Sequence, residues 1–407
     1  MLLARDCAIL GFGLMLAAAS TEARELQFSV ESRISGDSNV LRTSSDRRAD
    51  GIYSLSPEVI LRENHSKLNY RFSYRPTYET FFTTSGIDGF DHRAQGVLSW
   101  RPTGIGTFDL NGNFSNRRNL RLEDENAGTG SPSFVENDRT RVQRFDAQLS
   151  YNRAISEAFS VQASATIDDV DHSRGTDVDS RAYSGTLGLQ YTMNPTTAVG
   201  LSASIRERQS RPGGGSQFES DTEIWNVAFS LQRVLTPNLS FSAQAGPSFL
   251  STKQTVPPSS TLQNENSSST SFFALLAIDR AWQRSDFRAS YVRSESSGGN
   301  NAVSSINDNI SLDFHYRIDR QSTFRILAKW LRSEEISSVP GPGGEKLETT
   351  QYSGFASLNR RITRRWTVVG QLSFSSQDQN DTPRSNAIGE VYSGYLSIRY
   401  TFDPIVF

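Results

Sequence analysis

The sequence contains almost no cysteine, with a single residue, Cys7, among 407. The chain that follows this N-terminal segment therefore has no thiol, which excludes a disulfide framework and cysteine chemistry. The sequence also lacks any apolar run of about 18 residues, which excludes a transmembrane helix. Neither sign of charge is in excess, with 42 Lys and Arg against 44 Asp and Glu. We therefore expect no nucleic-acid partner.

The one continuous apolar run lies at the N-terminus, over residues 8–19. Arg5 precedes this run, and small residues follow it up to Ala23. A short apolar segment between a basic residue and small residues is typical of a secretory signal peptide. We therefore predict a signal peptide at residues 1–23, with cleavage after Ala19 or Ala23, and a mature chain of residues 24–407. A buried core segment is the alternative.

Polar and apolar residues alternate strictly over residues 68–78, where Tyr70, Phe72 and Tyr74 alternate with Arg71 and Ser73. A period of two predicts a β-strand with one apolar and one polar face. The same pattern recurs down the whole chain, although the mean hydropathy is only −0.48. In a membrane-spanning β-barrel only every second residue faces lipid, so a low mean hydropathy is compatible with a membrane protein.

Short polar or Pro/Gly-containing turns are predicted near residues 64, 103, 155, 195, 237, 283, 320 and 363, and longer polar loops lie between them. Eight short turns separate nine hairpins, which predicts about 18 strands, with 16 as the alternative count. Short turns on one side and long loops on the other are typical of outer-membrane barrels. We predict one all-β, transmembrane, up-and-down antiparallel β-barrel over residues 24–407. A soluble sandwich or propeller does not account for this systematic alternation.

Aromatic residues flank the predicted short turns repeatedly. Such rings settle at the boundary between hydrocarbon and headgroups, so their placement predicts an interfacial girdle around the barrel. The flanking aromatic residues are Trp100, Phe108, Tyr151, Phe159, Tyr191, Phe241, Phe287, Tyr316, Phe324, Trp366 and Tyr400.

Three segments near the N-terminus, residues 36–42, 53–59 and 68–74, resemble a family of β-barrel porins associated with exopolysaccharide loci and exosortase-type sorting systems of Gram-negative bacteria. The resemblance implies an outer-membrane pore with a link to polysaccharide export. The tail of five residues after the last clean strand departs from the family. Either Phe402 or Phe407 is therefore the terminal aromatic residue of the signal that the barrel-assembly machinery reads.

Little in the sequence points to catalysis. Ser311, Asp313 and His315 share one face of a predicted strand, but they stand in a row and do not converge as a catalytic triad requires. We therefore expect no enzymatic activity and no catalytic residue. The other histidines are placed in turns or loops: His65, His92 and His172.

An acidic cluster, Asp168, Asp169, Asp171, Asp177 and Asp179, offers oxygen ligands of the kind that Ca²⁺ prefers. Its spacing does not match an EF-hand loop, so a solvated surface loop is the preferred interpretation. We expect no metal site and no cofactor.

The period of two assigns one set of charged residues to the inside of the barrel. Two interpretations remain open for this set: a water-filled pore with a mild basic excess and weak anion preference, or opposite charges that pair across neighbouring strands. The predicted pore-lining residues are Arg71, Arg75, Asp109, Arg144, Asp146, Arg206, Arg288, Asp313, Arg325 and Lys329.

The sequence thus favours an outer-membrane porin for small hydrophilic solutes, which the family resemblance links to exopolysaccharide export. A non-conducting surface barrel whose extracellular loops bind a partner is the alternative. Either protein would contact outer-membrane lipid and the barrel-assembly machinery, and an export role would add polysaccharide-export partners. Residues 118–138 and 251–268 are candidates for a loop folded into the pore. No trimer interface is recognisable.

Overall fold

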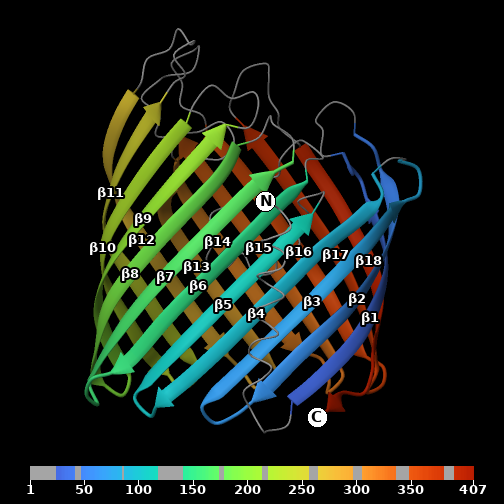
Figure 1. Cartoon of the computed structure of the whole chain (residues 1–407), viewed down its shortest axis with the longest axis horizontal. Helices are drawn as coiled ribbons and strands as arrows, with labels where there is room; N and C mark the ends of the chain where they lie inside the picture. The colour runs from blue at the N-terminus through green and yellow to red at the C-terminus, as the bar shows by residue number, and fades with distance from the viewer. Residues whose placement is uncertain are drawn as a thin grey trace.

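The computed structural model describes residues 24–41, 47–84, 87–117, 141–173, 178–212, 219–255, 265–296, 305–335, 348–379 and 389–407. Within these ranges the chain forms eighteen long strands and a two-residue strand at the C-terminus. Each long strand pairs antiparallel with the next, and the last long strand pairs with the first. The sheet therefore closes into a barrel (Figure 1). No helix of the described residues is long and apolar enough to cross a membrane.

The bounds of the strands are β1 Arg24–Asp37, β2 Asp50–Asn64, β3 Leu68–Phe81, β4 Gly89–Thr103, β5 Gly106–Arg117, β6 Val142–Ala154, β7 Phe159–His172, β8 Val178–Asn194, β9 Thr197–Pro212, β10 Glu219–Thr236, β11 Leu239–Thr255, β12 Glu265–Ala281, β13 Ser285–Ser296, β14 Ser305–Arg317, β15 Ser322–Glu335, β16 Glu348–Arg361, β17 Trp366–Gln379, β18 Gly389–Thr401 and β19 Ile405–Val406.

The predicted architecture is confirmed. All eight predicted short turns connect consecutive strands, from β2–β3 to β16–β17, and they lie together at one end of the barrel (Figure 1). The count of eighteen long strands agrees with the preferred prediction and not with the alternative of sixteen. The predicted signal peptide and the plug candidate at residues 118–138 lie outside the described residues. The second plug candidate is corrected in part, because residues 251–255 and 265–268 belong to β11 and β12.

The polar face of the sheet is the concave one. The Glu31 carboxylate on β1 lies 3.1 Å from the Arg75 guanidinium on β3, although β2 separates the two strands. Likewise, Gln244 Nε2 on β11 donates to Ser202 Oγ on β9 across β10, at 2.9 Å. Side chains of second-neighbour strands converge only on the inside of a closed wall. The polar residues therefore line the barrel interior, and the alternating apolar residues face outward.

Aromatic rings of neighbouring strands contact one another at both ends of the outer apolar band. Near the short turns, the ring centroids of Phe108 and Tyr151 are 4.4 Å apart, as expected for an interfacial girdle. Near the opposite end, Tyr78 and Phe90 are 4.9 Å apart. The second ring level was not identified in the sequence. Other pairs at the two levels are Trp100–Phe108, Phe159–Tyr191, Trp366–Tyr400 and Phe374–Tyr392.

The C-terminal tail lengthens the seam of the barrel. Strand β18 pairs with β1 from Ser29 upward, and after a short bend β19 resumes the pairing at Leu26. The backbone N–H of Phe407 donates to the Arg24 carbonyl at 3.0 Å, and the Arg24 N–H donates back at 2.9 Å. The Arg365 guanidinium binds the Asp403 carboxylate at the bend. Both Phe402 and Phe407 are thus in backbone contact with β1.

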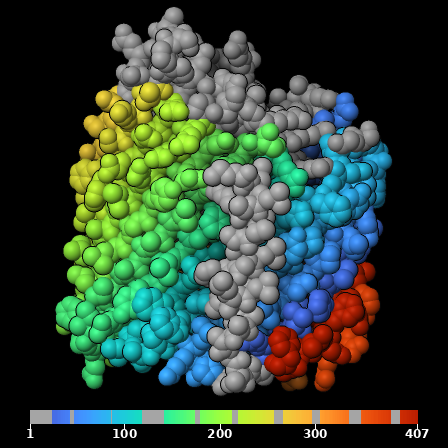
Figure 2. Space-filling model, in the orientation of Figure 1, coloured from blue at the N-terminus to red at the C-terminus, as the bar shows by residue number. Residues whose placement is uncertain are grey.

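The long-loop end of the barrel has a raised side. Strands β8 to β12 contain 16 to 18 residues, whereas the other long strands contain 12 to 15. In Figure 1 these green to yellow strands extend further toward the long-loop end than the other strands, and Figure 2 shows the same side of the barrel extending furthest among the coloured residues. On β10 the outer face changes from Trp225 to the charged residues Glu223 and Asp221. The extra length of these strands therefore lies beyond the apolar band.

Candidate functional site

The barrel interior is the candidate functional site. The strand register places all ten predicted pore-lining positions on the concave polar face. They do not form one ring. The structure distributes them over three sectors of the wall: Arg71 and Arg75 on β3; Asp109, Arg144, Asp146 and Arg206 on β5 to β9; and Arg288, Asp313, Arg325 and Lys329 on β13 to β15.

In the first sector, three guanidinium groups surround one carboxylate. Glu31 is almost fully buried, with 4% of the residue exposed. It lies 3.1 Å from Arg75, 3.3 Å from Arg33 and 3.0 Å from the Nε of Arg399. The Arg33 guanidinium also stacks over the Tyr395 ring at 4.1 Å. Glu31 therefore binds three positively charged groups near the β18–β1 seam. Glu58 on β2 also acts on Arg75, so three arginines face two carboxylates and this part of the wall has a basic excess.

Sequence analysis identified Arg75 here but did not include Glu31 among the pore-lining residues. Glu31 lies on the polar face of β1, and the alternation of polar and apolar residues in the sequence indicates this position. The sequence does not indicate the partners of Glu31, because Arg399 is 368 positions away and becomes a neighbour only when the barrel closes. Arginine and glutamate also meet near Arg71. The register partner of Arg71 on β2 is Arg62, and Arg62 forms an ion pair with Glu25.

The second sector, on β5 to β9, mixes basic and acidic groups with amides and hydroxyls. Asn113 Nδ2 donates to the Asp146 carboxylate at 2.8 Å, and the register pairs Asp146 with Asp168. Arg208, two residues beyond Arg206 on the same face of β9, donates to Ser180 Oγ at 3.0 Å. This sector therefore offers both donors and acceptors to a polar solute.

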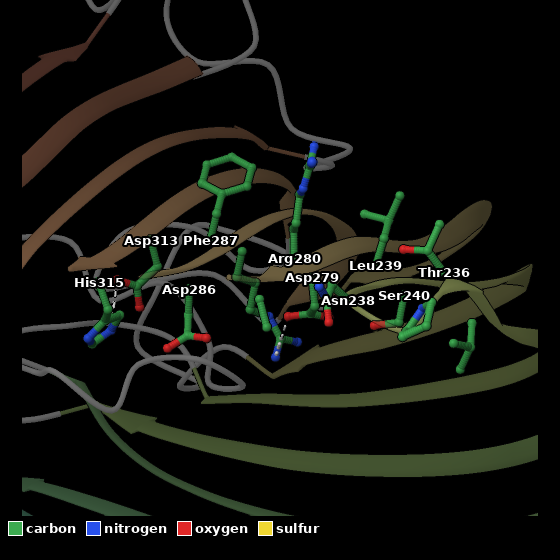
Figure 3. Close-up of a pocket in the computed structure, with 14 residues that line it drawn as sticks. Thr236, Asn238, Leu239, Ser240, Asp279, Arg280, Asp286, Phe287, Asp313 and His315 are labelled. Carbon is green, nitrogen blue, oxygen red and sulfur yellow. Dashed lines mark ion pairs between the residues drawn. The ribbon is translucent and has the colours of Figure 1, made fainter. Parts of the chain in front are cut away.

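The third sector contains a hollow of about 440 Å³ near the short turns (Figure 3). The Asp313 carboxylate binds the Arg325 guanidinium at 2.9 Å, and its other oxygen lies 3.2 Å from His315 Nε2. Arg288 lies 3.6 Å from Asp279 on β12. These pairs match the interpretation in which opposite charges meet across neighbouring strands and hydrate the wall.

Ser311, Asp313 and His315 share one face of β14, as expected, and do not converge. Ser311 Oγ lies 2.6 Å from Ser290 Oγ on β13, while Asp313 holds His315 and Arg325. A triad needs the serine hydroxyl on the histidine and the carboxylate on its other nitrogen. Here the hydroxyl is turned to the neighbouring strand.

Two other histidines are corrected by the structure. His92 lies within β4, with its Nδ1 2.9 Å from the Tyr74 hydroxyl and the two rings stacked on the outer face. His172 is the last residue of β7, beside Asp179 at 3.5 Å. Only His65 lies in a turn.

The acidic cluster is also corrected. Asp168, Asp169 and Asp171 belong to β7 and not to a surface loop. Because successive residues of a strand point to opposite faces, the carboxylates of Asp168 and Asp169 diverge. Asp169 instead binds Arg181 on β8 at 2.8 Å, on the outer face. Asp177 lies outside the described residues. Within the described ranges, no group of three or more His, Cys, Asp or Glu residues is arranged to hold a metal ion.

The outer face of the barrel indicates whether the barrel is surrounded by water or by lipid. Large apolar side chains are exposed along the strands, for example Leu187 at 58% and Leu372 at 72%. They occupy a band bounded by aromatic rings at both ends, on a closed antiparallel barrel with short turns at one end. Water would not stabilise such a face, whereas a bilayer would. The chain is therefore a transmembrane β-barrel of the bacterial outer membrane.

No family model and no curated protein sequence matches the chain. Solved structures of similar shape include the unliganded ferric citrate transporter FecA, at 11% identity and a TM-score of 0.47, covering 92% of this chain and 78% of that chain. OccAB3 of Acinetobacter baumannii has 8% identity and a TM-score of 0.44, covering 94% and 99%. OpdQ of Pseudomonas aeruginosa has 8% identity and a TM-score of 0.42, again covering 94% and 99%.

Proposed function

We propose that the barrel is a water-filled pore through which small hydrophilic solutes cross the outer membrane. The observation that carries the proposal is the polar interior wall. Its charged groups are bound to one another, as in the Glu31–Arg75 and Asp313–Arg325 pairs, and hydroxyl and amide groups lie between them. A barrel of 16 to 18 strands is wide enough to enclose an aqueous channel.

Planar-bilayer recordings of the refolded chain test the proposal. A conducting pore gives stable current steps, and a folded sample that stays silent contradicts it. Silence would favour the other candidate, a surface barrel that works through its extracellular end. The raised strands β8 to β12 are the observation that favours this second candidate.

Ion selectivity tests the electrostatic part of the proposal. Changing Arg71 and Arg75 to Ser removes two positive charges from the first sector and should lower anion preference. Arg181→Ser is the matched control, since Arg181 pairs with Asp169 on the outer face. Selectivity that responds equally to both sets of changes would contradict the assigned interior face.

The family resemblance supports a finer proposal, that the solute is a polysaccharide or a fragment of one. Side chains with hydroxyl and amide groups suit sugar hydroxyls, and the interior is rich in them, for example at Ser373, which is 2.6 Å from Ser393. Soluble acidic or neutral oligosaccharides should then block the current transiently. A polysaccharide-export partner should also co-purify with the barrel from the native membrane.

The assembly machinery is the second proposed partner. The terminal strand and tail end in aromatic residues whose backbones contact β1. Phe402→Ala and deletion of Phe407 should differ in their effect on assembly in cells, measured by the heat-modifiable mobility of the folded barrel. The change with the larger effect identifies the terminal aromatic residue that the machinery reads. Equal wild-type assembly of both variants would contradict this proposal.

A further inference from the structure

Three of the eight short turns share one sequence pattern. The turns β12–β13, β14–β15 and β16–β17 each begin with a large apolar residue and have an arginine two positions later. All residues of the eight short turns are described, and the other five turns do not show this pattern. We call the three turns the arginine turns. Their residue pairs are Trp282 and Arg284, Ile318 and Arg320, and Ile362 and Arg364.

The turn β6–β7 has the same backbone geometry as two of the arginine turns but the opposite charge. In β14–β15 the N–H groups of Ile318 and of the next residue donate to the Ser322 carbonyl at 3.0 and 3.4 Å. The N–H groups of the corresponding residues donate to the Trp366 carbonyl in β16–β17 and to the Phe159 carbonyl in β6–β7. In β6–β7 the position of the arginine is occupied by Glu157. The backbone of the turn therefore does not require an arginine.

The arginines of the three turns are available to a ligand. Arg284, Arg320 and Arg364 are exposed, and none of them forms an ion pair with another described residue. Asp319 is the only acidic residue in these turns, and its carboxylate already accepts backbone N–H groups of its own turn. Apart from His65, the charged residues of the other five turns are Lys67 and Glu157, whose charges balance. The arginine turns thus form a basic side of the short-turn end.

The outer faces of the adjoining strands add two arginines to this side. Arg280 lies on the outer face of β12, and its guanidinium is 4.7 Å from the centre of the Trp282 ring. Arg360 lies on the outer face of β16, next to Leu358 in the alternation, and is exposed. Figure 3 shows Arg280 on the opposite side of the sheet from the interior residue Asp286. Interior carboxylates therefore lie behind the wall and not beside these arginines.

The apolar residues of the arginine turns lie at the edge of the membrane. The exposed fractions are 43% for Trp282, 43% for Ile318 and 50% for Ile362. They follow directly after, or precede, the aromatic girdle that marks the interface, for example at Trp366. Short turns of an outer-membrane barrel face the periplasm. Each turn therefore presents an apolar side chain and a positive charge at the headgroup level of the leaflet that faces the periplasm.

A groove on the outer face adjoins the first arginine turn. The register sets Arg280, Phe287 and Phe314 side by side on the outer faces of β12, β13 and β14. The groove has a volume of about 490 Å³, and its walls combine aromatic rings with one guanidinium group. Arginine binds phosphate oxygens through parallel N–H groups. The lining residues are Trp282, Gln283, Arg284, Ser285 and Phe314.

We propose that the arginine turns bind anionic phospholipids of the leaflet that faces the periplasm. The headgroup phosphate binds the arginine of each turn, and the apolar residue of the same turn contacts the glycerol and acyl region. Neighbouring strands are about 4.8 Å apart, so successive arginine turns are on the order of 10 Å apart and can each hold a lipid. A soluble polyanion would use the charge but not the apolar residue. The proposal concerns the outer face and is independent of pore activity.

Lipid retention tests the proposal. The full-length mature barrel is transferred to neutral detergent micelles that contain equal amounts of phosphatidylglycerol, which is anionic, and phosphatidylcholine, which is zwitterionic, with identical acyl chains. Native mass spectrometry counts the molecules of each lipid that the barrel retains. We expect phosphatidylglycerol to be retained in preference, and 10 mM inorganic phosphate not to displace it.

Paired variants locate the binding. Arg320→Gln combined with Arg364→Gln should lower the ratio of retained phosphatidylglycerol to phosphatidylcholine at least about tenfold, because one basic residue near an anionic surface changes affinity about fivefold. Arg153→Gln combined with Arg233→Gln is the matched control. Both control residues are exposed on the outer face at the same end of the barrel, and this ratio should stay within about twofold of the wild type.

Two further variants test the pattern itself. Glu157→Arg completes the pattern behind Ile155 in the turn β6–β7 and should raise the number of retained phosphatidylglycerol molecules. Ile318→Ser combined with Ile362→Ser keeps the arginines and should lower retention. Heat-modifiable mobility verifies that each variant is folded, and channel recordings on the same samples report pore activity separately.

Four outcomes would overturn the proposal. One is equal retention of the two lipids by the wild type. Another is an equal loss in the Arg320/Arg364 and Arg153/Arg233 variants, which would mean diffuse attraction to the whole short-turn end. A third is unchanged retention after the two Ile→Ser changes together with displacement of the lipid by polygalacturonate, which would make a soluble polyanion the occupant. The last is a Glu157→Arg variant that gains no lipid.

Discussion

Glu31 and Arg75 form a 3.1 Å ion pair although a whole strand separates β1 from β3. On its other side the same carboxylate binds Arg399 of β18. One buried acid on β1 thus binds arginines of β18 and β3 on either side of the seam. It also neutralises part of the basic surface that would otherwise face the pore.

Replacing Glu31 by Gln should make the pore more selective for anions. The change removes the carboxylate that binds Arg33, Arg75 and Arg399. Hydrogen bonds to charged groups contribute about 1.5–3 kcal/mol each, so the free energy of unfolding should also fall by about that amount. Reversal potentials in a salt gradient measure selectivity. Glu207→Gln, at an exposed position on β9, is the control and should change neither quantity.

Replacing Leu187 by Arg should destabilise the barrel by about 2–4 kcal/mol. Leu187 lies on the outer face of β8, between Tyr183 and Tyr191, near the middle of the apolar band. An arginine at the bilayer midplane carries this penalty, and near the interface it carries about 0–1 kcal/mol. Reversible urea unfolding from phospholipid bilayers measures the difference. Equal stability of Leu187→Arg and Glu207→Arg would mean that lipid does not contact this face.

Gly246→Ala should destabilise the wall between β10 and β11. A Cβ built at Gly246 would lie 1.9 Å from the Val227 carbonyl oxygen and 2.8 Å from the Ala228 Cα, both of them backbone atoms. Relieving that overlap requires the two strands to separate, at a cost of about 1–3 kcal/mol or more. Gly370→Ala on β17 is the matched control, since nothing lies within 4 Å of its built Cβ. The same unfolding assay compares the two.

The turn between β14 and β15 should loosen in acid. The Asp319 carboxylate accepts the backbone N–H of Gln321 at 2.6 Å and that of Ser322 at 2.7 Å. These bonds, that from Gln321 first, hold the pKa of Asp319 below its ordinary value. A carboxylate with a lowered folded pKa stabilises the turn above its unfolded pKa, and this stabilisation is lost as pH falls through the folded pKa.

The measurement for Asp319 is a titration of its side-chain carboxyl by NMR, with the Gln321 amide as a second reporter. Asp319→Asn keeps an oxygen acceptor but does not titrate, so the Gln321 amide should then be insensitive to acid. A Gln321 amide that follows the same acid titration in both proteins would rule out Asp319 as the cause.

The strands could be predicted because polar and apolar residues alternate along each of them with a period of two. This period is favourable along every strand, because the apolar residues face lipid outside the barrel and the polar residues face water inside it. Tyr70, Phe72 and Tyr74 show it without any knowledge of their neighbours. The alternation is weakest over residues 272–279, because Phe273, Leu275 and Ala277 are apolar residues on the interior face of β12.

The contacts of the site were less predictable, because they depend on register and closure. Arg75 could be assigned to the interior by counting, but its partner depends on the stagger between β1 and β3. His92 was misplaced because a polar residue on an outward position looks like the start of a loop.

The closure of β1 upon β18 also sets a condition on biogenesis. The N-terminal strand emerges from export first, yet one of its sides stays unsatisfied until the final residues of the polypeptide arrive. Until then, the unpaired edge of β1, whose partner strand lies more than three hundred residues away in the sequence, must be protected from pairing with other strands. A chain that is truncated before its last strand cannot close the barrel, and we expect it to aggregate or to be degraded during export.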